Sequence, residues 1–374
     1  MRKAMDMDLI YSFFDAANMH RWNDHLRPTE LTELDKQAHK IMIAWVLAKF
    51  EEDEGREKIN WRELIEHTMF SFIRRIILTD LKPQLFHRIV KEKENEMNEF
   101  VIREFDARIP DTDKKFRERF IAYLNREGMS REDRIIKAAH YLATEWEFKL
   151  VYKANPSMFG IDRTKEAIDK QIMEFEDIAG VKKLLFGRDT FNFIDLCGQL
   201  RFQKRWAKVP RIPPTSVLGH MLLVANMMYL HNLDTGTDDQ RVYKNYFTAL
   251  FHDLPEVLTK DVITPIKTSI DGLDELLSEY EKEEMARTVL PLLPKGWHKE
   301  FHSLTDDPFE GEDGRSIKVC DQLAAFMEAH VSGCYGITSK ALSRGKDEIR
   351  KKLLSSRTKI DVKSLIEKLE GMDL

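Results

Sequence analysis

The segment 251–261, FHDLPEVLTKD, places a histidine and three carboxylates in an otherwise apolar run. Two more candidates for polar chemistry, His220 and Asp321, stand in other apolar stretches. Imidazole and carboxylate groups together suit divalent ions such as Mn, Fe, Co, Ni or Zn. Two histidines and two carboxylates also leave positions for water and substrate on a metal that prefers six ligands. The sequence therefore predicts a metal site made by His220, His252, Asp253 and Asp321.

Each of these residues also has an ordinary structural interpretation. A lone histidine on an apolar helix is more often a satisfied core residue, and Asp321 could be a hydrogen-bonded boundary residue. Neighbours on a helix diverge by about 100°, so His252 and Asp253 can share a metal only at its edge. Pro255 should disturb or end regular helix there. It is the spacing of the whole set that favours a metal site.

The elements that must position these residues are predicted to be helices. Glycine and proline are scarce, and apolar residues recur at helical spacing in runs such as IMIAWVLAKF, MLLVANMMYL and KVCDQLAAFMEA. Alternating strands with hairpin turns are missing from the pattern. We expect an all-α protein, and 374 residues suggest two domains or one enlarged by a repeat.

Composition limits the class of protein and its partners. A hydrophobic content of 43%, a charged content of 33% and a net charge of −5 are ordinary for a soluble protein and suggest no nucleic-acid or membrane partner. The three cysteines form no CxxC pair, which fits a reducing compartment. Without a signal-peptide pattern or a long apolar run, the expected location is the cytoplasm.

A faint internal repeat runs through the chain. HRWNDHLRP resembles KRWAKVPRIP, and the Arg-Trp pairs in the two segments match at an offset of 184. Three later blocks match at an offset of 181, and they pair His39 with His220, Asp80 with Asp261 and His140 with Asp321. We therefore predict tandem helical bundles: a degenerate domain at 1–165, a linker at 166–189 and a catalytic domain with C-terminal helices at 190–374.

The two predicted copies differ in their polar residues. At the offset of 181, Ser71 and Phe72 lie opposite His252 and Asp253, and Arg75 lies opposite Glu256. We expect no metal in the first copy. It could stabilise the active copy or bind a regulatory nucleotide.

The H…HD…D pattern resembles that of the HD-domain metal-dependent phosphohydrolases. HDLPEVLTKDVITPIK is closer to the 5′-deoxynucleotidase subgroup, which has a similar HD-x-x-E-x-x-x-x-D stretch followed by T-P-x-K. An Arg-Trp pair before the first histidine also fits that subgroup. The resemblance covers roughly residues 192–336 and implies that the four predicted ligands hold one divalent cation.

The resemblance also implies roles for other residues, each of which has a simpler alternative. Glu256 would handle a proton, or be a surface glutamate. Asp261 would contact the sugar or orient the leaving group, or cap a helix. Arg205 and Lys267 would bind phosphate, or be solvated, and Trp206 would form a wall against the sugar, or be a core aromatic.

The implied activity is removal of the 5′-phosphate from (deoxy)nucleoside monophosphates with Mn, Co, Fe, Ni, Zn or Mg. Cleavage of a nucleoside triphosphate or a cyclic phosphodiester, and a non-catalytic nucleotide sensor or scaffold, are the alternatives. Members of the subgroup usually form dimers. We therefore expect an intrachain pseudo-dimer of the two copies, with a homo-oligomer as a further possibility.

Overall fold

The computed structural model describes residues 2–55, 58–79, 83–260 and 272–374. The regular elements in these ranges are helices, and strand-type pairing is restricted to two isolated bridges, so the all-α prediction is confirmed. The chain divides into two compact units, residues 1–180 with 230–239, and residues 181–229 with 240–374. In the described ranges, no helix is long and apolar enough to cross a membrane.

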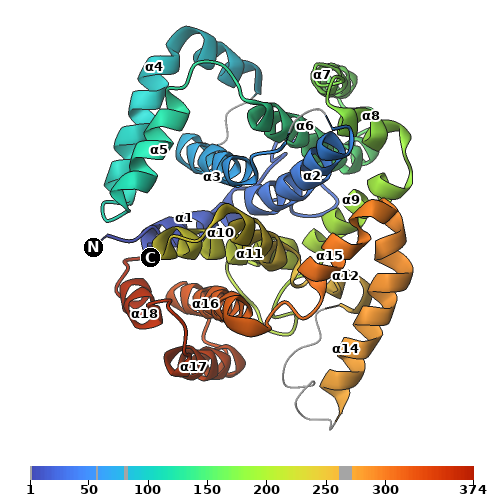
Figure 1. Cartoon of the computed structure of the whole chain (residues 1–374). Coiled ribbons are helices and arrows are strands. Elements are labelled where there is room, and N and C mark those ends of the chain that lie inside the picture. Colours follow the sequence, from blue (N-terminus) through green and yellow to red (C-terminus); the bar gives the residue numbers. More distant parts are fainter. Residues whose placement is uncertain (1, 56–57, 80–82, 261–271) are drawn as a thin grey trace. The chain divides into compact units, whose positions relative to one another are not determined.

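The first unit is built on two long helices. Figure 1 shows α2 and α6 side by side, and their facing sides are almost wholly buried. Thr32 caps the start of α2 and Ser130 forms a capping box at the start of α6, which fixes where both helices begin. The helices of this unit are α1 (Met7–Asp15), η1 (Ala16–Asn18), α2 (Glu33–Asp53), α3 (Trp61–Leu78), α4 (Pro83–Arg108), α5 (Lys114–Leu124), α6 (Arg131–Ala154) and α7 (Ile161–Met173).

The second unit contains the first two thirds of the apolar helix α10 (Val217–Thr235) and the whole of the long helix α16 (Gly311–Cys334). Helix α17 packs on α16 (Figure 1). The segment 166–189, predicted as a linker, contains most of α7 and the whole of α8 (Ala179–Phe186). The remaining elements are α9 (Asp189–Gln199), η2 (Leu200–Phe202), α10 (Val217–Thr235), α11 (Asp239–Phe251), α12 (Glu256–Thr259), α14 (Leu273–Glu284), η3 (Met285–Val289), η4 (Leu290–Leu292), η5 (Lys295–Trp297), α15 (His298–Thr305), α16 (Gly311–Cys334), α17 (Lys340–Ser355) and α18 (Val362–Glu370).

Several local features occur once in each unit at a constant spacing. Trp22 and Trp206 both have a positive φ, 55° and 58°. The isolated bridge between His20 and Thr32 has a counterpart between Lys204 and Ser216, at the same offset as the two tryptophans. The short helices η1 and η2 also start at this offset from each other. The duplication stays a prediction, and these shared features support it.

The same features change the predicted pairing of His39 with His220. Helix α2 begins after Thr32 and α10 begins after Ser216, and these two residues are equivalent in the isolated bridges, so the residue at the position of His220 is Lys36. His39 lies one turn further along α2, where its ring meets Trp146 edge-on at 5.2 Å between centroids. The sequence matched two histidines because a three-residue shift brings them nearly back to the same helix face.

Candidate metal centre

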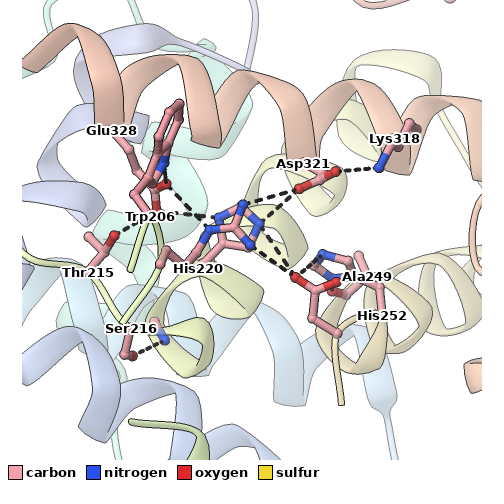
Figure 2. A network of polar contacts seen from close by, with 12 residues as sticks. Trp206, Thr215, Ser216, His220, Ala249, His252, Lys318, Asp321 and Glu328 are labelled. Atoms are coloured by element: carbon pink, nitrogen blue, oxygen red, sulfur yellow. Dashed lines mark hydrogen bonds and ion pairs between the residues drawn. The ribbon is translucent and has the colours of Figure 1, made fainter. Parts of the chain in front are cut away.

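His220 lies in the first turn of α10. The Ser216 hydroxyl accepts a hydrogen bond from the Gly219 amide at 3.0 Å, which fixes the start of the helix. The imidazole is fully buried, and its Nε2 lies 3.0 Å from Oδ1 of Asp321 on α16. Figure 2 shows the two side chains pointing toward each other. This first contact joins residues 101 positions apart in the sequence.

His252 lies just past the end of α11, where the chain leaves the helix. Helix α11 ends at Phe251, residues 252–255 form turns, and α12 begins after Pro255. Proline therefore interrupts the helix as predicted, and the turn frees His252 and Asp253 from the divergence of helical neighbours. It also means that Glu256 does not share a continuous helix with His252.

The tautomer of His252 follows from its hydrogen bond. Its Nδ1 lies 2.8 Å from the Ala249 carbonyl oxygen, which can only accept, so Nδ1 carries the proton. Its Nε2 is buried, lacks a hydrogen-bond partner among the described residues and therefore presents a lone pair. A neutral imidazole held by a backbone carbonyl is the usual arrangement of a metal-binding histidine.

The ligand atoms converge on one point. One atom each from His220, His252 and Asp321 lies within 4.8 Å of the other two. Oδ2 of Asp253 lies 3.2 Å from Nε2 of His252 and 4.0 Å from Nε2 of His220. These distances, the mixed nitrogen and oxygen donors and the unpartnered His252 Nε2 fit a divalent cation, with Asp253 at the edge of the set.

The electrostatics of the cluster favour a bound positive charge. Burial raises the pKa of Asp321, but Lys318 and the two histidines outweigh burial and hold that pKa well below its usual value. Burial also raises the pKa of Asp253, but the neighbouring side chains of His252 and Arg205 outweigh burial and lower it. Both carboxylates are therefore ionised at neutral pH and available as ligands.

Arg205 lies against both carboxylates. Its guanidinium donates to Oδ2 of Asp253 at 3.2 Å and lies 3.9 Å from Oδ1 of Asp321. Burial lowers the pKa of Arg205, but the surrounding carboxylates, Glu328 first, outweigh it and raise that pKa. The structure thus brings the predicted phosphate-binding arginine to the edge of the metal cluster.

Glu328 was missed in the sequence and organises the buried side of the site. Its carboxylate accepts from the Thr215 hydroxyl at 2.7 Å, the Trp206 indole at 3.0 Å and Nε of Arg205 at 3.4 Å. It also lies 3.6 Å from Nδ1 of His220, as Figure 2 shows. The available signal was its spacing: Glu328 follows Asp321 by seven residues, two helical turns, within an apolar helix.

Of the other predicted site residues, the structure describes Trp206 and Glu256. The Trp206 ring is held by Glu328, and its outer edge faces Gly345 of α17, so that edge is covered by protein. Glu256 begins α12 and contributes to the charge around Arg205. Asp261 and Lys267 lie outside the described residues.

Comparison with known proteins identifies the second unit's fold. The HD domain family matches residues 197–354, which span the metal cluster, Arg205 and Glu328. This region is an HD domain. A 5′-deoxynucleotidase of Pectobacterium atrosepticum is 29% identical over 150 residues, which is 37% of this chain and 70% of that enzyme. The 5′-deoxynucleotidases of Photobacterium profundum and Vibrio parahaemolyticus are each 27% identical over 146 residues, or 37% of this chain and 72% of each enzyme.

The chain therefore contains an HD domain, and its C-terminal part is similar to the 5′-deoxynucleotidases. The resemblance inferred from the H…HD…D pattern is thereby confirmed. The aligned relatives correspond to the C-terminal part of the chain.

Proposed function

We propose that the HD domain removes the 5′-phosphate from (deoxy)nucleoside monophosphates in a metal-dependent hydrolysis. The observation that carries the proposal is the convergence of His220, His252 and Asp321 from three separate segments, with Arg205 at the edge of the cluster. The likeness to 5′-deoxynucleotidases supports the choice of substrate.

His220, His252 and Asp321, with Asp253 as the fourth ligand, would hold the cation. When bound, the cation would polarise a phosphoryl oxygen and lower the pKa of water. The residues that hold it are rigidly placed before any substrate arrives, because each is fixed by a hydrogen bond or an ion pair of its own.

Arg205 and Glu256 would act on the substrate. Arg205 has a planar set of donors, and a phosphate that approaches the cluster meets a guanidinium already aligned by Glu328 and Asp253. The Glu256 carboxylate would accept a proton from the attacking water or return one to the leaving oxygen. Trp206 would border the sugar with the part of its ring that Gly345 does not cover.

The test is a hydrolysis screen of the full chain with Mn or Co. Phosphate release is measured from deoxy- and ribonucleoside monophosphates, and pyrophosphate or diester cleavage from triphosphates and cyclic phosphodiesters. Asp253→Ala and His252→Ala should abolish turnover, while His302→Ala serves as a matched control because His302 is exposed. Bound metal is counted in the same preparations.

Each result has a definite meaning. Monophosphate hydrolysis that Asp253→Ala leaves intact would refute the assignment of the cluster. If the chain hydrolyses only triphosphates or only cyclic diesters, those compounds replace monophosphates as the proposed substrate class. If the protein binds one metal per chain but hydrolyses none of these compounds, the result favours the alternative of a non-catalytic nucleotide sensor or scaffold.

A further inference from the structure

The first unit contains a buried polar cluster at the place that corresponds to the metal centre. Arg21 donates to Glu147 at 2.8 Å, and the Trp22 indole donates to the same carboxylate at 3.0 Å. Arg205, Trp206 and Glu328 form the same arrangement in the HD domain. The first unit therefore keeps the buried frame of the site.

A lysine stands at the position of one predicted metal ligand, and a second lysine lies one helical turn away. Lys36 occupies the helix position of His220, and its Nζ lies 2.6 Å from Nδ1 of His140. One turn along α2, the Nζ of Lys40 donates to the Ser71 hydroxyl at 2.9 Å. Lys36 is wholly buried and Lys40 is 2% exposed. The cluster thus holds two buried lysine amines.

The two lysines are not neutralised by carboxylates at hydrogen-bond distance. In the described part of the unit, their hydrogen-bond partners are an imidazole and a hydroxyl. The carboxylate of Glu33 instead contacts Arg21 at 2.8 Å and Arg75 at 3.3 Å. Buried ammonium groups with neutral partners are costly unless they lose a proton or gain an anion.

The pKa values of both lysines agree with this description. Burial, followed by the charge of Arg21, lowers the pKa of Lys36 well below its usual value. Burial lowers the pKa of Lys40 to about 7, against the opposing charge of Glu33. Burial and the neighbouring lysines also lower the pKa of His140, so its imidazole is neutral and can accept from Lys36.

We propose that this cluster is a metal-independent binding site for a phosphate group, in which Lys36 and Lys40 supply the positive charge. The cluster reaches solvent at Arg75, Arg21, Ser71 and His140, all of which are partly exposed or lie at its rim. Two ammonium groups beside two guanidinium groups suit a dianion with several acceptor oxygens. Inorganic phosphate and the phosphate of a nucleotide share this chemistry.

Anion binding at this site takes up protons. The charged groups around the lysines are Arg21, Glu33, Arg75 and Glu147, and the titratable imidazole of His140 on α6 lies beside Lys36. Burial lowers the pKa values of the two lysines, whereas the arginines stay protonated. The anion therefore changes the protonation of the lysines more than that of the arginines. A phosphate dianion restores the protonated form of both lysines.

The experiment is calorimetric titration of the full-length His252→Ala chain in EDTA at pH 8, which silences the metal site. The probes are inorganic phosphate and 2′-deoxyadenosine 5′-monophosphate, each in two buffers of different ionisation enthalpy. Lys36→Met and Lys40→Met each remove one amine that can take up a proton, and Lys153→Met is the matched control on the exposed surface of α6. Circular dichroism and melting curves check that each variant folds, and Arg75→Gln replaces any lysine variant that does not.

We expect one binding event per chain with proton uptake, weakened at least tenfold by either lysine variant and unchanged by Lys153→Met. Tighter binding of the nucleotide than of phosphate would identify the ligand as a nucleotide, and equal binding would identify free phosphate. The proposal is overturned if neither probe binds in EDTA, or if Lys36→Met binds as tightly as the parent chain. Because the metal is absent throughout, failure here is distinct from failure of hydrolysis by the HD domain.

Discussion

Replacing Glu328 by glutamine tests whether one buried carboxylate holds the metal centre in place. Glu328→Gln keeps the size and shape of the side chain but removes its charge and one acceptor. The carboxylate is fully buried and close to two arginines, Arg205 at 3.4 Å and Arg211 at 3.9 Å. Those guanidinium groups would keep their charges and lose a counterion.

The loss of stability in Glu328→Gln depends on the charge compensation that the two arginines keep. Loss of one partner from a buried charge pair costs about 3–5 kcal/mol. Asp253 still compensates Arg205 at 3.2 Å, so we expect the lower end, about 3 kcal/mol. For a unit of this size that loss lowers Tm by about 6–12 °C. His220 loses the carboxylate beside its Nδ1, and second partners of this kind contribute about 10–100-fold to metal affinity.

Two assays separate the stability effect from the metal effect. Urea and thermal unfolding give the free energy of unfolding, and titration with Mn or Co gives metal affinity at a temperature where the variant is folded. The control is Glu348→Gln, at an exposed ion pair with Arg344 that is worth under about 1 kcal/mol. Our account of Glu328 is refuted if its glutamine variant matches the control in both unfolding and metal affinity.

Three further outcomes are expected. Removing metal with EDTA should lower the Tm of the HD domain, because a cation present at 100 times its Kd adds about 2.7 kcal/mol, and an unchanged melting curve would contradict a resident metal. Burial raises the pKa of Asp133, but hydrogen bonds from His67 and Arg126 outweigh burial and lower it to about 2. Its stabilisation is therefore complete above the unfolded pKa near 3.9 and is lost as pH falls through about 2, so Asp133→Asn should cost roughly 2 kcal/mol in urea unfolding at pH 7 and progressively less toward pH 2. Gly314→Ala should destabilise the chain by about 1–3 kcal/mol, because the new methyl group meets the backbone of the loop before α16, whereas Gly333→Ala in the same helix meets open space and should be neutral or stabilising.

The sequence predicted the parts of the site that depend on residue type. The spacing of two histidines and two carboxylates in apolar segments predicted a metal site, and the structure brings His220, His252 and Asp321 together. The break at Pro255 was also predictable, because proline cannot continue a helix at that point. The helical class followed from periodicity alone.

The parts that depend on tertiary contact were not predictable in the same way. Glu328 lies two helical turns after Asp321, but its role depends on its partners Thr215 and Trp206, which the sequence does not place beside it. The lone pair on His252 is set by a carbonyl three residues back, which the sequence does not distinguish from any other helix end. The amino-acid sequence by itself says little about which of several polar side chains point into the interior of the fold.

The pairing of His39 with His220 shows how a repeat can mislead. In the predicted repeat, the offset of 184 describes the Arg-Trp segments and the starts of α2 and α10, and the offset of 181 describes the later blocks. Because His39 lies within one helical turn of the position equivalent to His220, the sequence comparison paired His39 with His220 in place of Lys36. The register given by the bridges changes the chemistry expected of the first unit, from a metal site with two missing ligands to a buried cluster that contains two lysines. Loss of ligands alone would leave buried carboxylates and arginines around an empty centre, which is costly. Lys36 and Lys40 instead place two buried amines at that centre, which can take up protons when an anion binds, and the frame of Arg21, Trp22 and Glu147 lies beside them.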